Sequence, residues 1–384
     1  MRTPKILITG SQWFGDLLPF CERGLLSLGA EVRTVATNQF EWMEGAKRLR
    51  QRLAPLPLVG SHLDWKLSQS HRRRLIAGVN QKVLEAVNDW RPDILLSILC
   101  WSEPITDELF DRLPNGNQPI KIAWLMDDPF QHDGSLAGIV PRYDLVYVVD
   151  GSWIEPIRLF TGRAAAELPC GADLQAYHPA PAETLASDWR CGIAFVGSSY
   201  RGHVVGKLRS SLLKQVADLK LHIYGDQGWR CEAPSPSGEC EVAACYRGGE
   251  LSSEEANLAY NGADIALNIH HPQFRMGTSL RTFAISAAGV FQLVDWRPGL
   301  DRFFVLDEEI VAYRTPEDLR EKAVYYLADD VARRRIARAG YERVRREHTY
   351  ARRLAQMLRD AELAPARGNR NPSMAVAGRG VITE

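Results

Sequence analysis

The chain has no long hydrophobic run and no excess of charge of either sign. None of its apolar stretches approaches the roughly 20 residues that a helix needs to cross a bilayer. Its 47 Lys and Arg residues equal its 47 Asp and Glu residues, so bulk charge gives no reason to expect nucleic acid or an anionic membrane as a partner. The N-terminal residues lack an apolar core of signal-peptide length, and we therefore expect a cytoplasmic protein.

Cysteine is also scarce, and its spacing argues against the common metal and disulfide patterns. The seven cysteines are odd in number, which fits reduced thiols better than a disulfide framework. Cys231, Cys240 and Cys245 share a loop rich in proline, glycine and serine, but no pair has C-x2-C spacing and the loop lacks histidine. No D-x-D motif stands at the end of an expected strand. We therefore predict no zinc site and no catalytic metal.

What the chain does contain is a repeated alternation of short apolar strands and helices. Its 384 residues are enough for two domains, each with its own core. In the first half we expect strands at residues 5–9, 31–36, 94–99, 122–126 and 145–149, with helices at 16–28 and 69–88. This pattern predicts an α/β protein whose first domain is a doubly wound parallel sheet. The turn after the first strand lacks G-x-G-x-x-G, which argues against a dinucleotide.

A second alternation begins near residue 193 and predicts a second Rossmann-like domain. We expect strands at 193–196, 221–224, 264–269 and 290–295, and helices at 316–327, 331–346 and 349–363. The predicted units are an N-terminal domain over 1–172, a C-terminal domain over 173–345, a crossover helix over 346–364 and a disordered tail over 365–384. Two such domains place a cleft between them, where small-molecule sites are common.

The segment from Asn268 to Gly289 is the most informative for function. An apolar strand, a polar loop, a Thr278-Ser279 cap signal and a short helix ending at Gly289 form a βαβ unit with the next strand. In open α/β sheets ligands bind beyond the carboxyl ends of such strands, and a helix N-terminus favours a phosphate. Arg281, two residues inside the cap, adds a forked cationic donor. These features predict a nucleoside-diphosphate site.

Residues at the ends of other strands extend this predicted site. The loop after the strand at 193–196 offers backbone N–H groups and an arginine to phosphates, and polar residues at two more strand ends are candidates to meet the base or sugar. The predicted nucleotide-binding residues are Gly197, Ser198, Ser199, Arg201, Tyr224, Gly225, Asn268, Thr278, Ser279, Arg281 and Thr282. The alternative for Arg201 is a surface position, and for Asn268 and Tyr224 it is a local role at the strand end.

A general base is expected on the acceptor side of the cleft. Asp127 and Asp128 follow the expected strand at 122–126, and two adjacent carboxylates raise one another's pKa, which suits proton transfer. His132 is a second candidate for this catalytic role, and Asp16 is a third. The competing interpretation of the two aspartates is an ordinary turn at the end of a strand.

Four segments of the chain match the pattern of one family. Residues 168–179 (LPCGADLQAYHP) resemble the crossover that links the two domains of GT-B fold glycosyltransferases, and residues 195–201 (FVGSSYR) resemble the first strand and phosphate loop of their nucleotide-sugar domain. Residues 266–295 are similar to the signature "lNixx…sxRxFE…aGxfqLvd", and residues 347–350 (EHTY) resemble the closing helix. In this order the segments identify a resemblance to the spore-maturation-protein (CgeB-like) type of the glycosyltransferase family-1/4 lineage. The N-terminal half matches only in architecture and in residues 124–129.

The resemblance implies a GT-B architecture, with two Rossmann-like domains facing a cleft and C-terminal helices beside them. It further implies a metal-independent glycosyltransferase with no cofactor, which takes a nucleotide sugar, UDP-linked or another NDP-linked one, as its substrate. The acceptor would be a glycan, a lipid or a protein bound by the N-terminal domain, and no nucleic-acid partner is expected. The basic run at residues 71–74 leaves peripheral membrane association open, although such runs are more often a solvated helix face.

One position departs from the family pattern. The family has a glutamate where this chain has Ala284, and in the family that carboxylate accepts hydrogen bonds from the donor ribose. Losing such a charged partner costs about 1.5–3 kcal/mol of donor binding, or about one to two decades in affinity. The chain would then compensate from another side chain, use an unusual donor, or be weak or inactive. The alternative functions are a non-catalytic GT-B-like protein that binds a nucleotide or glycan, and a nucleotide-sugar epimerase.

Overall fold

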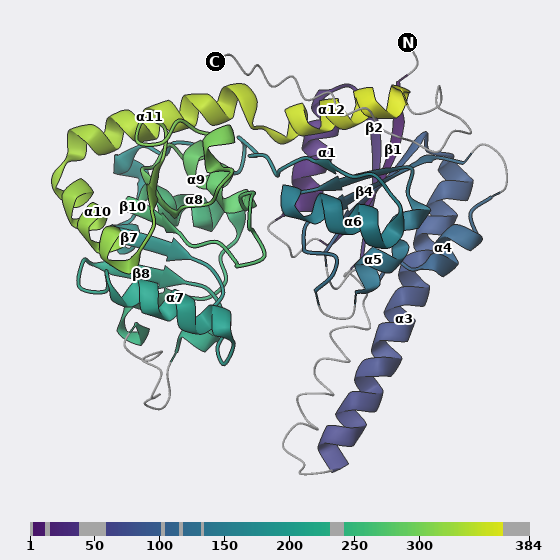
Figure 1. Ribbon diagram of the computed structural model, residues 1–384, viewed down its shortest axis with the longest axis horizontal. Helices are drawn as coiled ribbons and strands as arrows, with labels where there is room; N and C mark the ends of the chain where they lie inside the picture. Colours follow the sequence, from purple (N-terminus) through teal and green to yellow (C-terminus); the bar gives the residue numbers. More distant parts are fainter. Residues whose placement is uncertain are drawn as a thin grey trace.

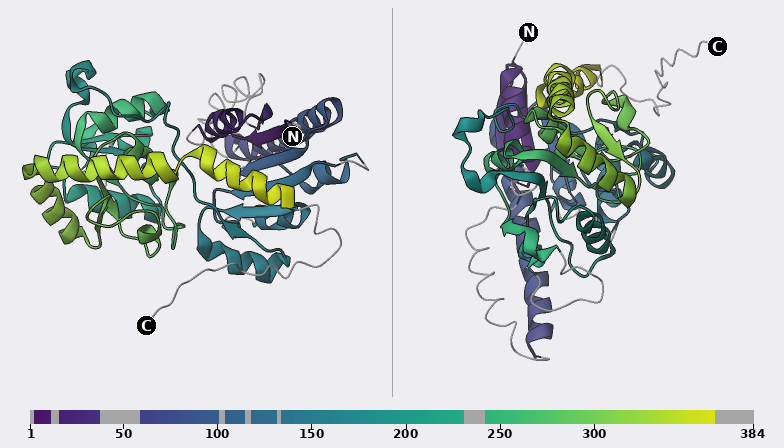
Figure 2. Two further views of the ribbon diagram at one scale, coloured as in Figure 1. Left: turned by 90° about the horizontal axis from the view of Figure 1, so that it is seen from above. Right: turned by 90° about the vertical axis from the view of Figure 1, so that its left-hand side faces the viewer.

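Two parallel β-sheets, one in each half of the chain, form the frame of the molecule (Figure 1). The structure is a computed structural model that describes residues 3–11, 16–37, 59–100, 104–114, 118–131, 134–230 and 242–363. The two sheets lie side by side with helices packed around them, and the final helices run along one side of both domains (Figures 1 and 2). The arrangement confirms the α/β class with two Rossmann-like domains.

The N-terminal sheet is built entirely from parallel pairs among its described strands. Its strands are β1 (Lys5–Gly10), β2 (Glu31–Ala36), β3 (Ile94–Leu99), β4 (Ile120–Leu125), β5 (Leu145–Val148) and β6 (Ala166–Glu167). The helices of this half are α1 (Leu17–Ser27), α3 (Val59–Trp90), α4 (Asp107–Asp111), α5 (Ser135–Ile139) and α6 (Ile154–Thr161). The strand order is β2-β1-β3-β4-β5-β6. Every residue of β3 is buried, as expected for a central strand covered by helices on both faces.

The C-terminal sheet repeats this architecture. Its strands are β7 (Cys191–Val196), β8 (Leu221–Tyr224), β9 (Tyr246–Gly248), β10 (Ala263–Asn268), β11 (Gln292–Asp295) and β12 (Val311–Tyr313). Its helices are α7 (Val204–Lys214), α8 (Ser253–Asn261), α9 (Leu280–Ala287), α10 (Pro316–Ala328), α11 (Asp330–Glu347) and α12 (Tyr350–Leu363). The strand order is β12-β11-β10-β7-β8-β9, again with parallel pairs. The carboxyl ends of the central strands of both sheets therefore border the space between the domains.

The hydrophobic pattern locates the central strands and the edge strand β2 but misses the other edge strands of the described sheets. The edge strands β6, β9 and β12 have two or three residues each, which is too short to show a periodicity. The pattern also places the start of α3 at residue 69 rather than at Val59, because Gly60 and Ser61 are weak helix formers. Cys231, Cys240, His132 and the tail from residue 365 lie outside the described residues.

The last helix, α12, returns from the C-terminal half and packs on the N-terminal domain (Figure 2). Tyr350, Leu354 and Met357 on α12 are buried in the same apolar core as α1 and β1. At the crossover, the backbone N–H of Ala172 donates to the carbonyl of His348 at 2.8 Å, and the N–H of Tyr350 donates back to Ala172 at 3.2 Å. The two segments that link the domains therefore run against each other.

A substitution at Gly171 tests how closely these two segments must approach. A Cβ at this position would lie 2.6 Å from the backbone carbon of Thr349 and the nitrogen of Tyr350, and backbone atoms cannot turn aside as a side chain can. We expect Gly171→Ala to lower the free energy of unfolding by about 1–3 kcal/mol in urea denaturation. Gly138→Ala is the control, because a Cβ there meets nothing within 4 Å. Equal stability of the two variants would contradict the close packing.

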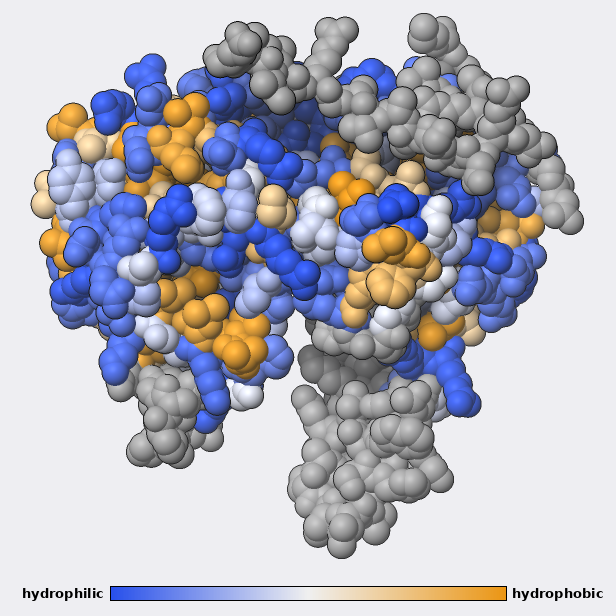
Figure 3. All heavy atoms as spheres, in the orientation of Figure 1, coloured by the Kyte–Doolittle hydropathy of each residue, from blue (hydrophilic) through white to orange (hydrophobic). Residues whose placement is uncertain are grey.

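The visible surface carries mostly polar side chains, with separate apolar groups on both domains (Figure 3). One such group lies over α6, where Leu159 and Phe160 are 66% and 77% exposed. Within the described ranges, no helix is both long enough and apolar enough to cross a membrane.

Candidate functional site

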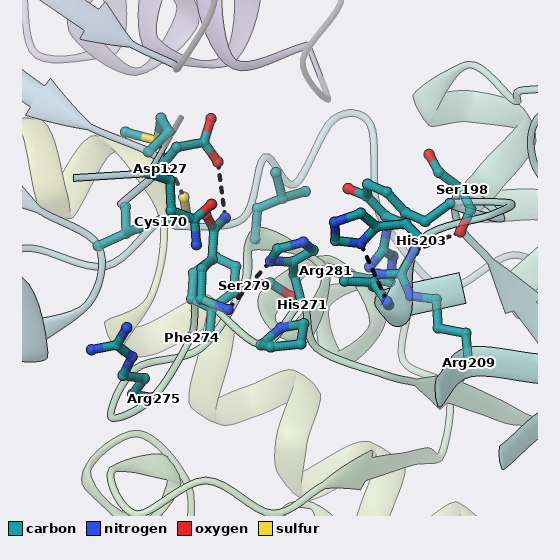
Figure 4. A pocket seen from close by; sticks show the side chains of 18 of the residues that line it. Asp127, Cys170, Ser198, His203, Arg209, His271, Phe274, Arg275, Ser279 and Arg281 are labelled. Atoms are coloured by element: carbon teal, nitrogen blue, oxygen red, sulfur yellow. Dashed lines mark hydrogen bonds between the residues drawn. The ribbon is translucent and has the colours of Figure 1, made fainter. Parts of the chain in front are cut away.

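A cavity of about 810 Å³ lies between the two domains (Figure 4). One wall comes from the loops after β4 and β5 and from the crossover segment. The other comes from the loops after β7 and β10 and from the first turns of α7 and α9. This is the position, beyond the carboxyl ends of parallel strands, at which open α/β sheets bind ligands.

Arg281 lines this cavity from the first turn of α9. Its guanidinium lies against the loop after β7, since a Cβ on Gly197 would be 3.5 Å from Nη2 of Arg281. It also forms a hydrogen bond with the hydroxyl of Tyr260, whose pKa is raised by burial even though the arginine lowers it. Tyr260 therefore stays neutral and leaves the positive charge of Arg281 uncompensated. Ser279, the N-cap of α9, also lines the cavity, and its buried hydroxyl has no hydrogen-bond partner in the described part of the chain.

A second arginine, Arg209 on α7, was not predicted and lines the same cavity. Its side chain is only 3% exposed. Nη1 donates to the carbonyl of Ser198 at 2.6 Å and Nη2 to that of Ile269 at 3.4 Å, while the ring of Tyr200 lies 4.9 Å from the guanidinium. Burial, followed by the nearby charge of Arg281, lowers the pKa of Arg209 to about 10. It is therefore still a cation at neutral pH.

Neither arginine has an ion-pair partner among the residues that the structure describes. A buried cation without a counter-ion is unfavourable unless a ligand supplies the negative charge. Arg281 lies close enough to Arg209 for its charge to lower the pKa of Arg209. The cavity thus carries two positive charges, those of Arg209 and Arg281, beside the N-terminus of α9.

The loop after β7 contributes less to the cavity than its sequence predicted. Ser198 lines the cavity, but the N–H of Gly197 donates to the carbonyl of Tyr224 at 2.9 Å. Ser199 is held by Asp226, which accepts from its backbone N–H at 2.7 Å and from its hydroxyl at 2.6 Å. Arg201 is exposed and donates to the carbonyl of Arg230. Arg209, and not Arg201, therefore lies with Arg281 in the lining of the cavity.

Three other predicted ligand residues lie behind the cavity wall. Asn268 is fully buried and its amide donates to Thr282 at 2.9 Å and to Gln292 at 3.0 Å. His270 contacts the hydroxyls of Thr278 and Thr282, at 2.8 and 3.2 Å, through Nε2. This network joins β10, β11 and α9, and none of these residues lines the cavity. Contrary to the expectation from the sequence, Asn268, Thr278 and Thr282 lie outside the lining of the cavity and join α9 to the neighbouring strands.

Tyr224 and Gly225, predicted to flank the base, are also part of the packing. The ring of Tyr224 lies 5.4 Å from that of Trp189, and the N–H of Gly225 donates to Gly248 at 3.2 Å. A Cβ on Gly225 would lie 2.2 Å from the carbonyl oxygen of Gly197. Close approach of two strand ends, and not a ligand, therefore explains the glycine.

Asp127 lines the cavity on the side opposite to Arg209 (Figure 4). Its Oδ1 accepts a hydrogen bond from Nε2 of Gln273 at 2.8 Å, across the domain boundary. Asp128, by contrast, does not line the cavity, and its Oδ1 accepts from the N–H of Phe130 at 3.0 Å. The structure therefore separates the two adjacent carboxylates that the sequence grouped together, and leaves Asp127 as the one facing the cavity.

Asp150, just after β5, links the two domains through hydrogen bonds to its carboxylate. Its fully buried carboxylate accepts hydrogen bonds at Oδ2 from the N–H groups of Arg275, Met276 and Gly277, at 2.8, 3.0 and 2.8 Å. Its Oδ1 accepts from the N–H of Ser152 at 2.9 Å. The loop that leads from β10 to Arg281 is thus held by a residue of the opposite domain.

A second, smaller cavity of about 330 Å³ opens on the other side of Arg281. Its lining includes Asp16, Glu250 and Ala284, and it shares Leu280 and Arg281 with the interdomain cavity. The hydroxyl of Ser253 donates to the carboxylate of Asp16. Asp16, expected as an acceptor-side candidate, therefore lies in the smaller cavity and not beside Asp127.

Part of the chain is similar to known proteins in sequence. Residues 207–359 match the family model described as "Glycosyl transferase-like". The spore protein CgeB of Bacillus subtilis (strain 168) is 35% identical over 100 residues, which are 23% of this chain and 30% of CgeB. The match thus spans less than a third of that relative.

Three solved structures illustrate the similarity of the fold. An alpha-glucosyltransferase in complex with UDP and a 13-mer DNA has a TM-score of 0.62 at 10% identity. Sucrose-phosphate synthase from Thermosynechococcus elongatus has a TM-score of 0.59 at 14% identity, and HepE of Anabaena, in complex with UDP and glucose, has 0.56 at 11%. Each likeness covers 94% of this chain and 100% of the other. The solved structures show that the chain has the two-domain fold of GT-B glycosyltransferases, and the family match covers residues 207–359.

Proposed function

We propose that this protein transfers a glycosyl group from a nucleoside-diphosphate sugar to a hydroxyl group of an acceptor. The observation that carries the proposal is the pair of arginines, Arg209 and Arg281, which lie at the interdomain cavity without a counter-ion in the described part of the chain. A diphosphate supplies that missing charge. Two similar structures hold UDP, which supports UDP as the first nucleotide to test.

The site residues suit the departure of a diphosphate. As the bond between the anomeric carbon and the diphosphate oxygen breaks, negative charge grows on that oxygen. Arg209, Arg281 and the free N–H groups at the start of α9 are fixed around the place where this charge develops, so little reorganisation is needed. The partnerless hydroxyl of Ser279 adds a donor at the same helix end.

Asp127 is the residue best placed to handle the acceptor. It belongs to the N-terminal domain and faces the cavity, with Oδ1 fixed by Gln273 at 2.8 Å. We assign it the general base: as the acceptor oxygen bonds to the anomeric carbon, its proton passes to the Asp127 carboxylate. A glycan, a lipid or a protein can supply such a hydroxyl, and the N-terminal domain would select among them.

The test is a binding screen followed by a product assay. We expect one nucleoside diphosphate among UDP, GDP, ADP, CDP and dTDP to raise the melting temperature saturably without added metal. The nucleoside monophosphate with the same base should bind at least about tenfold more weakly, because it lacks one charge-assisted contact worth about 1.5–3 kcal/mol. The corresponding nucleotide sugar should then release diphosphate in proportion to added acceptor glycoside.

Other outcomes identify the competing functions. Binding without diphosphate release in any acceptor screen indicates a non-catalytic binding protein, which the alanine at position 284 would favour. Release that needs no acceptor, with a changed free sugar, indicates an epimerase. No response to any diphosphate would contradict the assignment of Arg209 and Arg281.

A further inference from the structure

Two cavities meet at Arg281, which lines both of them together with Leu280. A nucleoside-diphosphate sugar has its two end groups on opposite sides of a central diphosphate. With the diphosphate at Arg281, each cavity therefore receives one end group. The larger cavity holds Asp127 of the acceptor-binding domain, so the sugar belongs there and the smaller cavity remains for the nucleoside.

Building on the proposed function, we propose that the smaller cavity binds the donor nucleoside and that Glu250 accepts hydrogen bonds from its ribose hydroxyls. The cavity volume of about 330 Å³ lies at the lower end of the range for small-molecule sites. Val196, Leu251 and Ala256 give it apolar walls, and the rings of Tyr177 and Tyr260 line it as well. Such walls suit a flat base, whereas a ribose diol needs hydrogen-bond acceptors.

The carboxylates of this cavity differ in what they already bind. Ala284 lines the cavity, so its side chain offers no acceptor there. Asp16 and Glu250 are the two carboxylates among the described lining residues. Asp16 accepts the hydroxyl of Ser253. Glu250 has no hydrogen bond or ion pair to any other residue in the described ranges, and it is exposed on the loop between β9 and α8.

Of the two carboxylates, Glu250 is therefore the one with all of its acceptor sites unused by other residues of the described ranges. A carboxylate offers about four lone-pair sites and can accept both hydroxyls of a diol. Glu250 and Ala284 line the same cavity, so a carboxylate from the loop between β9 and α8 is available to the cavity that a glutamate at position 284 would also line. The chain would thus recognise ribose from a different element than its family does.

The test compares a ribonucleoside diphosphate with its 2′-deoxy counterpart. Wild-type protein should prefer UDP over 2′-deoxy-UDP in calorimetric titration, or the matched pair of whichever base it binds. Glu250→Ala should lower the affinity for UDP about tenfold and abolish the preference, leaving 2′-deoxy-UDP binding nearly unchanged. Glu254→Ala is the control, because Glu254 is an exposed glutamate on α8 outside the cavity lining.

A rescue variant separates ribose recognition from a general electrostatic effect. Adding Ala284→Glu to the Glu250→Ala protein should restore the preference for UDP, because it returns a carboxylate to the same cavity. If Glu250→Ala keeps the wild-type preference, or if Asp16→Asn loses it instead, the assignment of Glu250 is overturned while the proposed donor site stands. If the wild-type protein binds no nucleoside diphosphate at all, the proposed function itself fails.

Discussion

Replacing Arg209 by methionine is expected to lower the affinity for the donor diphosphate by about one to two orders of magnitude. Methionine has about the length of the aliphatic part of an arginine side chain. The packing of that buried part is therefore mostly kept, while the charge is lost. A hydrogen bond to a charged group contributes about 1.5–3 kcal/mol, which corresponds to this range of affinity. Calorimetric titration with UDP, with the melting temperature of the free protein as a check on folding, measures the effect.

The same experiment distinguishes Arg209 from Arg201. Arg201 is exposed and contacts the carbonyl of Arg230, so Arg201→Met should leave UDP affinity within about twofold of wild type. Arg281→Ala should match Arg209→Met in direction and size. The double variant should bind too weakly to titrate, because both charges serve one ligand. A larger loss in Arg201→Met than in Arg209→Met would reverse our assignment and restore the interpretation based on the sequence.

Substituting Asp150 should have the largest effect on stability. Asp150→Ala removes a fully buried acceptor from the N–H groups of Arg275 and Met276, whose hydrogen bonds are partly buried, and of Gly277, whose hydrogen bond is buried. We expect a loss of about 3 kcal/mol or more in the free energy of unfolding, since a buried donor left unsatisfied costs about 1–3 kcal/mol. Donor affinity should fall as well, because the freed loop leads directly to Ser279 and Arg281 at the start of α9. Urea denaturation and UDP titration measure the two effects.

Asp144→Ala is the matched control for this substitution. The Asp144 carboxylate also accepts a backbone N–H, from Lys121 at 2.8 Å, but its side chain is 42% exposed and its partner lies in the same domain. Water replaces that acceptor, so we expect a loss below about 1 kcal/mol and unchanged donor affinity. If Asp150→Ala were as mild as Asp144→Ala, the domains would be held together by other contacts.

The part of the site that the sequence predicted is the part encoded by neighbouring residues. Arg281 was identified because its strand, cap and helix signals lie within about twenty residues of one another. The central strands of both sheets were located for the same reason, since each is a continuous apolar run. Patterns among neighbouring residues predict local structure. They are most informative where a single βαβ unit forms the whole of a binding feature, as it does around Arg281.

Residues whose role depends on distant packing were missed or misplaced. Arg209 lies in a helix with other polar residues and reads as a surface position, yet it is buried by loops after two separate strands. Asp150 acts on backbone groups more than a hundred positions away, with a separation of 125 to the first of them. Asp127 and Asp128 are adjacent in sequence, but the turn points only the former into the cavity. No periodicity or motif records such contacts.

The return of α12 to the N-terminal domain has a consequence for synthesis on the ribosome. Gly24 of α1 packs against Leu354 of α12, since a Cβ on that glycine would lie 2.8 Å from the leucine methyl. The first domain to emerge therefore exposes the apolar face of α1 until the last described helix has been translated. Its folding is completed only once α12 has been translated, and a nascent polypeptide paused before that point should be a preferred client of chaperones that bind exposed apolar segments.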